Sequence, residues 1–221
     1  MRKNLLPWQL LTLAALVLPM LYLLWAWPRV PAQVPLHFGP DGRVNGYGSR
    51  DHLWLLTVAL PLGVALLFSA LPHFDPKRRL DGGSVNFQKL RLVTVALLGG
   101  INSYILYLAL HPSTGPGRGL VVALGLFFAL LGNYLTTVQP NYFVGIRTPW
   151  TLENPAVWAR THRMGGILFC VGGLLLAGLA LVLPLAWAMP MLLVMILGIA
   201  GFSCIYSYVL FRQHAHPPKP V

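Results

Sequence analysis

The sequence is poor in acidic residues and in charge of either sign. It contains five Asp and Glu among 221 residues, and only 10% of its residues are charged, against roughly 25% in ordinary soluble domains. Hydrophobic residues make up 56% of the chain. The polar side chains are too few to cover a water-soluble globule, so the composition indicates an integral membrane protein.

Cysteine is also scarce. The two cysteines, Cys170 and Cys204, lie in apolar runs and lack C-x-x-C spacing, so no zinc or redox motif is present. We expect both to be small, buried packing residues. The sequence has no Walker, G-x-S-x-G or dinucleotide-binding motif either. It therefore predicts no metal ion and no cofactor.

Long apolar runs are abundant, and each is near or above the ~18 residues expected of a membrane helix. They cover residues 5–27, 53–71, 92–110, 119–138, 165–183 and 187–210. The predicted fold is an all-α membrane protein with six transmembrane helices, a short structured external loop and a structured cytoplasmic loop. We expect one integral membrane unit, with a four-helix part over residues 1–138 and a second part over residues 139–221. The first run exceeds the ~7–15 residues of a signal-peptide core, so we interpret it as a retained helix.

The basic residues predict the orientation of these helices. A cytoplasmic N-terminus places all but four of the 16 Lys and Arg residues inside, as the positive-inside rule requires. The exceptions are Arg29, Arg43, Arg50 and Arg118. Both termini are then cytoplasmic. The net charge of +11 indicates topology and attraction to anionic lipid, and its scatter over separate loops argues against direct nucleic-acid binding.

The first external loop, residues 28–52, carries hairpin signals. Residues 39–42 read Gly-Pro-Asp-Gly, a pattern typical of a type I turn. The flanking residues 34–38 and 44–47 are predicted to pair as strands, and Ser49 is predicted to be the N-cap of the second helix. His37, Asp41, Asp51 and His52 are metal-ligand types, but their irregular spacing favours a polar loop against the lipid headgroups over a metal site.

Residues 141–166 read NYFVGIRTPWTLENPAVWARTHRMGG and are dense in hydrogen-bonding and aromatic side chains. Asn154 followed by Pro155 predicts the N-cap and first position of the fifth transmembrane helix. Ser84 is likewise predicted to cap the third. Trp158 and His162, four residues apart, should share one helix face. A loop that only connected two helices would not need so many hydrogen-bonding and aromatic side chains, so we expect residues 141–166 to have a specific shape.

Two interpretations of this segment stay open. In the first it is a cap on the fold, with Trp150 and Trp158 at the membrane interface and an Arg147–Glu153 ion pair. In the second it is a docking surface or anion site, since a guanidinium can grip a carboxylate or phosphate. An enzymatic role would rest on His162 alone, because no second His or Cys stands beside it at ligand spacing.

The predicted spans contain mild polar residues and no carboxylate. The absence of a carboxylate argues against a proton-coupled transporter. The polar residues are expected to form interhelical hydrogen bonds; they are Asn102, Ser103, Asn133, Thr136 and Thr137. Small residues four apart, Gly166 with Cys170 and Gly173 with Ala177, favour close helix packing.

The internal segment resembles the signature of the SdpI family. The similarity lies in Asn133-Tyr134, in residues 141–152 (NYFVGIRTPWTL), in Val157-Trp158 and in Thr161-His162. Residues 34–38 (VPLHF) with Asp41-Gly42 are similar to an uncharacterised domain that precedes this signature in many members. Together the two regions cover most of the chain.

The resemblance implies a protein of the bacterial cytoplasmic membrane that gives immunity to a secreted peptide toxin, the family being named for a sporulation-delaying toxin. It also implies signal transduction, because the founding member captures a cytoplasmic autorepressor at the membrane. The expected partners are the lipid bilayer, a toxin outside and a repressor inside. The candidate inner contact residues are Asn141, Arg147, Thr148, Trp150, Glu153, Trp158 and His162. The candidate outer ones are His37, Phe38, Asp41 and Gly42.

Two further functions remain as alternatives. One is a membrane enzyme or small-solute transporter that uses His37 and Asp41 outside or Arg147 and His162 inside. The other is a purely structural, lipid-organising protein.

Overall fold

The computed structural model describes residues 4–39, 44–76, 80–113 and 117–215, and these are mostly helical. The predicted turn residues Pro40, Asp41 and Gly42 lie outside the described residues. In chain order the elements are α1 (Leu6–Ala26), the 3₁₀ turn η1 (Trp27–Arg29), β1 (Gln33–Phe38), β2 (Val44–Ser49), α2 (His52–Trp54), the π-helical turn η2 (Leu55–Ala59), α3 (Leu60–Phe74), α4 (Val85–Leu110), α5 (Gly119–Leu135), α6 (Pro149–Glu153), α7 (Pro155–Val182) and α8 (Leu185–Ala215).

Among the described residues, five helical segments are long and apolar enough to cross a membrane, whereas six were predicted. The sixth apolar helix, α5, has 17 residues and ends at Leu135, short of the predicted end at Val138. The helix stops there because the hydroxyls of Thr136 and Thr137 donate to the carbonyls of Asn133 and Tyr134, at 2.7 and 2.9 Å. These bonds tighten the last turn.

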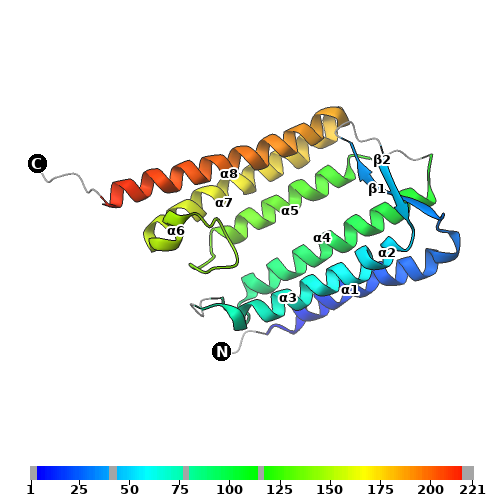
Figure 1. The fold of residues 1–221 in the computed structure, drawn as a ribbon, viewed down its shortest axis with the longest axis horizontal. Coiled ribbons are helices and arrows are strands. Elements are labelled where there is room, and N and C mark those ends of the chain that lie inside the picture. The colour runs from blue at the N-terminus through cyan, green and yellow to red at the C-terminus, as the bar shows by residue number, and fades with distance from the viewer. Residues whose placement is uncertain (1–3, 40–43, 77–79, 114–116, 216–221) are drawn as a thin grey trace, which may run out of the picture.

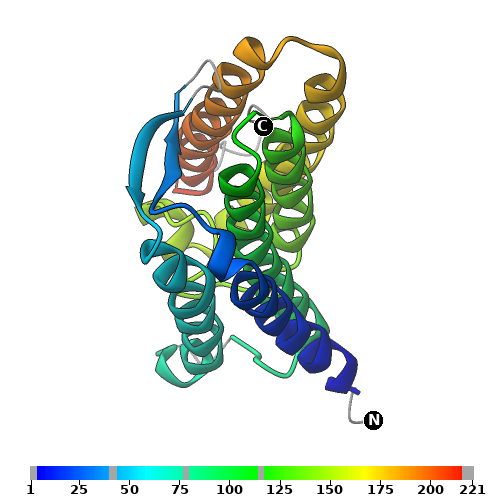
Figure 2. The same ribbon diagram turned by 90° about the vertical axis from the view of Figure 1, so that its right-hand side faces the viewer.

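The helices form two groups that meet at α4 and α5. These two lie in the middle of the molecule, with α1 and α3 on one side and α7 and α8 on the other (Figures 1 and 2). The β-hairpin lies at one end of the bundle. The start of α1, the end of α8, α6 and the connection from α5 to α7 lie at the other end (Figure 1).

The hairpin rests on the first helix group. Its strands are antiparallel, as predicted, and Val34 of β1 is fully buried in a cluster with Leu23, Leu53 and Leu106. Beneath it, the Asn102 side-chain amide of α4 donates to the carbonyl of Leu56 in the π-helical turn, at 2.7 Å. A π turn leaves the regular helix ladder, so this bond satisfies a carbonyl there. The predicted interhelical hydrogen bond is confirmed for Asn102.

Glycine pairs bring α5 and α7 into contact. A Cβ atom on Gly132 would meet the carbonyl oxygen of Gly166, and one on Gly166 would meet that of Gly132. Gly125 and Gly173 face each other in the same reciprocal way. The glycines are seven residues apart on both helices, which run antiparallel, so each pair shares one seam. Predicted close packing through small residues is confirmed here.

Local capping signals had mixed outcomes. The Ser84 hydroxyl accepts from the Phe87 amide and caps α4, as predicted. The Ser49 prediction is wrong, because β2 extends through that residue and Asp51 occupies the N-cap position of α2.

The prediction of two buried cysteines is also wrong: Cys170 is half-buried and Cys204 is exposed.

Candidate functional site

The α5–α7 loop, residues 136–154, is held in shape by the buried side chain of Asn141. The Asn141 amide nitrogen donates to the carbonyls of Gln139 and Val144, at 2.8 and 3.0 Å. Its oxygen accepts from the backbone amides of Phe143 and Val144, at 2.8 and 2.7 Å. One side chain thus supplies hydrogen-bond partners to backbone amides and carbonyls that no helix or strand satisfies in this irregular segment.

Trp158 and His162, both buried on α7, fasten the loop to that helix. The Trp158 indole nitrogen donates to the carbonyl of Val138 at 3.0 Å. His162 stacks on the indole, with ring centroids 3.9 Å apart. His162 Nε2 accepts from the Ile146 amide at 2.8 Å, and Nδ1 lies 2.9 Å from the carbonyl of Trp158. This pattern assigns the proton to Nδ1 and engages both nitrogens, so neither is free to act as a general base here.

Gly145 is needed where the loop passes over this pair. Its φ is +123°, a backbone conformation that residues other than glycine rarely adopt. A Cβ atom there would also collide with Nε2 of His162. Backbone conformation and contact therefore both require glycine in the Gly145-Ile146-Arg147 sequence.

A threonine cap joins the loop to α8. The Thr148 hydroxyl accepts from the Thr151 amide at 3.2 Å, and the Thr151 hydroxyl accepts from the Thr148 amide at 2.9 Å, forming a capping box at α6. Thr148 Oγ1 also lies 3.0 Å from Ser207 Oγ of α8. Trp150 packs on Tyr208, with ring centroids 5.0 Å apart. These residues tie α6 to the last helix.

The charged residues of the α5–α7 loop and of the first turns of α7 point outward. Arg147, Glu153, Arg160 and Arg163 are all exposed. The predicted Arg147–Glu153 ion pair is wrong: the Arg147 guanidinium donates to the carbonyl of Tyr142 at 2.6 Å, and no ion pair joins the two within the described part of the chain. Exposed guanidinium groups can bind carboxylate or phosphate, so this face is chemically suited to an acidic partner.

A cavity of about 350 Å³ opens beneath the loop, between α5, α7 and α8. Ile146 and Arg147 line it from the loop, and Ser203 and Cys204 line it from α8. The contributions of Ser203 and Ser207 were not anticipated from the sequence. Ser207 lies 59 residues from Thr148, which it contacts, and a serine in an apolar run has no local signal for such a contact.

Of the candidates predicted to face outside, those that the structure describes, His37 and Phe38, lie on the hairpin, at the opposite end of the molecule. His37 is exposed and its Nδ1 hydrogen-bonds the Asn45 side chain. Phe38 packs against the hairpin cluster. His52 Nδ1 lies 3.0 Å from the carbonyl of Ser49. Asp41 and Gly42 lie outside the described residues, and among those described no three His, Cys, Asp or Glu side chains gather as a metal site would need.

Comparison with known proteins matches two segments of the chain. Residues 137–207 match the SdpI/YfhL protein family. This confirms the resemblance seen in the sequence. Residues 14–69, which include the hairpin, match a domain of unknown function, DUF1648. No solved structure matches the chain.

A curated relative carries the SdpI name. The chain is 26% identical over 92 residues to "Immunity protein SdpI" of Bacillus subtilis (strain 168). The aligned part covers 42% of this chain and 44% of the relative, so less than half of either protein is compared. The family match over residues 137–207 contains the contacts of the loop with Trp158 and His162 of α7 and the Thr148–Ser207 contact with α8. It ends one residue before Tyr208, on which Trp150 packs.

Proposed function

We propose that this protein gives a bacterial cell immunity to a secreted peptide toxin and passes a signal across its cytoplasmic membrane. The observation that carries the proposal is the SdpI match over residues 137–207. This region contains most of the α5–α7 loop together with α7 and most of α8, the two helices that hold the loop. The relative named as an immunity protein supports the same function.

The proposed topology has six spans with both termini in the cytoplasm. The 17 residues of α5 cover about 26 Å at 1.5 Å per residue, close to the lower limit of about 17 residues for a spanning helix. Its position between α4 and α7 (Figure 1) supports a sixth crossing. The distribution of Lys and Arg supports an orientation with the α5–α7 loop inside and the hairpin outside.

The hairpin is the proposed toxin-facing surface. Its strand β2 carries Tyr47, which is 66% exposed, and β1 carries exposed His37 beside Phe38. An exposed aromatic side chain on a strand offers apolar area with little conformational freedom to lose, which suits binding of a hydrophobic peptide.

The opposite end is the proposed contact for a cytoplasmic repressor. Asn141, Trp158 and His162 would act by holding the loop, since they are buried and bonded within it. Arg147, Arg160 and Arg163 would make the contact, because they are exposed. The matching partner surface is acidic.

Survival of toxin-sensitive cells tests the immunity function. Cells expressing the full chain should grow when challenged with the sporulation-delaying protein toxin, whereas cells with empty vector should not. Membrane abundance is measured by immunoblot in parallel. Unchanged killing by this and several other secreted peptide toxins, with the protein present in the membrane, would contradict the proposal.

Repressor capture tests the inward contact separately. We expect the triple variant Arg147→Gln, Arg160→Gln, Arg163→Gln to lose membrane recruitment of a fluorescently tagged autorepressor from the sporulation-delaying system. The reason is loss of positive charge without loss of the buried loop contacts. Glu153→Gln makes the same surface more basic and should retain recruitment. Equal recruitment by the wild type and the triple variant would rule out this surface.

A further inference from the structure

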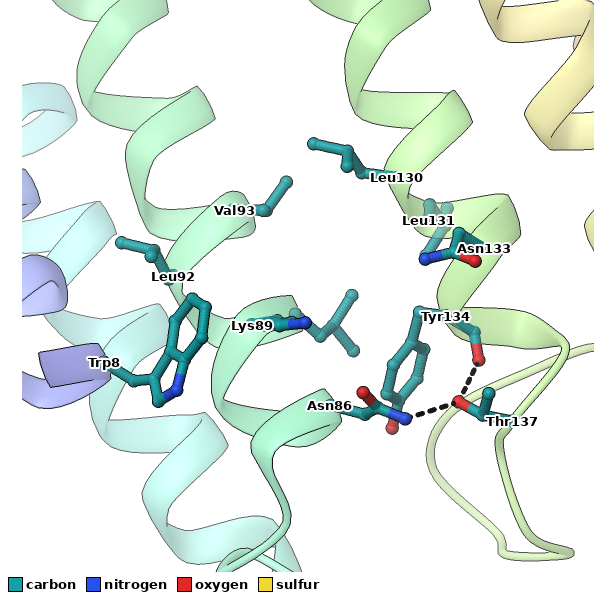
Figure 3. Close-up of a pocket in the computed structure, with 11 residues that line it drawn as sticks. Trp8, Asn86, Lys89, Leu92, Val93, Leu130, Leu131, Asn133, Tyr134 and Thr137 are labelled. Atoms are coloured by element: carbon teal, nitrogen blue, oxygen red, sulfur yellow. Dashed lines mark hydrogen bonds between the residues drawn. The ribbon is translucent and has the colours of Figure 1, made fainter. Parts of the chain in front are cut away.

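A groove separates the two helix groups at the end where the α5–α7 loop lies. It has a volume of about 310 Å³ and is bounded by α4 and α5, with Trp8 of α1 at one edge. Figure 3 shows the side chains of the two central helices facing each other across it. Several of these side chains are exposed, including Lys89, Asn133 and Leu130, so the groove opens to the outside of the bundle.

The groove changes from polar to apolar along its length. Near the loop, the Asn86 side chain donates to the Thr137 hydroxyl at 3.2 Å and bridges α4 to the end of α5. One turn further along α4 stands Lys89, and one turn further along α5 stands Asn133. Beyond these the lining is Val93 on α4 and Leu130 on α5, as Figure 3 shows. Both helices thus present polar groups at the same depth and apolar groups deeper in the bundle.

Lys89 gives the polar end a positive charge. Its ammonium lies 5.3 Å from the centroid of the Trp8 ring, which holds the cation at the edge of the groove. None of the described residues that line the groove is acidic. The charge of Lys89 is therefore available to an anion that enters from the membrane.

We propose that this groove binds one acidic phospholipid. The lipid phosphate lies at Lys89, with Asn86 and Asn133 as neutral hydrogen-bonding neighbours, and an acyl chain lies along Val93 and Leu130. A basic pocket between membrane helices suits an anionic headgroup, and a flexible ammonium suits phosphate as a point charge. The apolar continuation of the groove selects a lipid over free phosphate, because only a lipid supplies a chain to cover Leu130.

The site does not depend on the immunity function. It lies at the seam between the two helix groups, where Asn86 and Thr137 form a polar bridge. A lipid bound there would contact both groups at once and stabilise their relative position.

Native mass spectrometry of the purified full chain tests the site with two lipids of identical acyl chains, phosphatidylglycerol and phosphatidylcholine. Since one lysine near the surface contributes about 1 kcal/mol toward an anionic lipid, we expect about fivefold preference for phosphatidylglycerol. Lys89→Gln should abolish this preference, and Lys89→Arg should keep it. Arg163→Gln, an exposed basic residue on α7, is the matched control and should also keep it.

A second variant separates the groove from the charge. Leu130→Trp, which fills the apolar part at an exposed position, should weaken binding of both lipids. Inorganic phosphate at millimolar concentration should not displace phosphatidylglycerol. Equal binding of the two lipids by the wild type, retention of the preference in Lys89→Gln, unaltered binding by Leu130→Trp, or displacement by phosphate alone would each overturn the proposal.

Discussion

Replacing Gly132 with leucine is expected to lower the melting temperature of the purified protein by about 10 °C, since overpacking a close interface costs about 3 kcal/mol. The cause is the contact between α5 and α7. A Cβ atom at Gly132 already meets backbone atoms of Gly166, Phe169 and Cys170 at less than 3.0 Å. Backbone atoms cannot rotate away as a flexible side chain can, so the helices must separate. Thermal unfolding in detergent measures the effect.

Gly178→Leu is the matched control on α7, because a Cβ placed there meets no heavy atom within 4 Å apart from its chain neighbours and the backbone of its own helix. This variant should unfold within a few degrees of the wild type. If Gly132→Leu does not accumulate in the membrane, Gly132→Ala provides the comparison with Gly178→Ala. Equal melting temperatures for that pair would contradict the packing of α5 on α7.

Replacing Asn141 with alanine is expected to open the α5–α7 loop while the helices stay packed. The change removes four hydrogen bonds and should cost about 2–4 kcal/mol of local stability, because buried amides and carbonyls lose their partners. Trypsin cleavage after Arg147 should therefore accelerate by about 100-fold at the middle of that range. Timed digestion followed by mass spectrometry measures it.

Gln139→Ala is the control for this variant. It removes an exposed amide side chain two residues away while leaving the backbone carbonyl that Asn141 uses. Its cleavage rate should match the wild type. Cleavage of Asn141→Ala at the wild-type rate would show that the buried amide does not hold the loop.

Local signals in the sequence predicted much of the framework. Ser84 and Asn154 mark helix starts because each places a short acceptor side chain next to unpaired backbone amides. Strand-forming residues on either side of a Gly-Pro-Asp-Gly turn predict the hairpin. Ser49 misled because an N-cap residue and a strand-end residue look alike when the strand length is unknown.

Long-range contacts explain what the sequence did not reveal. Arg147 was expected to pair with Glu153 because Glu153 is the only acidic residue of the segment, but the guanidinium donates to the carbonyl of Tyr142 instead. The link from Thr148 to Ser207 spans 59 residues, and no local pattern marks it. The π-helical turn at Leu55–Ala59 receives a hydrogen bond from Asn102 in another helix, a contact that no local pattern marks.

The hairpin and the α5–α7 loop lie at opposite ends of one helix bundle (Figure 1). The hairpin lies within the DUF1648 match, and the α5–α7 loop lies almost entirely within the SdpI match. A protein that responds to an external peptide and contacts an internal partner needs its two surfaces on opposite sides of the membrane. The proposed function therefore depends on the sidedness of these two ends.

Cysteine labelling measures that sidedness directly. In a background of Cys170→Ala and Cys204→Ser, one variant carries Tyr47→Cys on the hairpin and another carries Glu153→Cys on α6, both exposed positions. A membrane-impermeant maleimide should label Tyr47→Cys in intact spheroplasts and should label Glu153→Cys only after lysis. Labelling of Glu153→Cys in intact spheroplasts, or of both variants only after lysis, would contradict the proposed orientation and with it the transmembrane role.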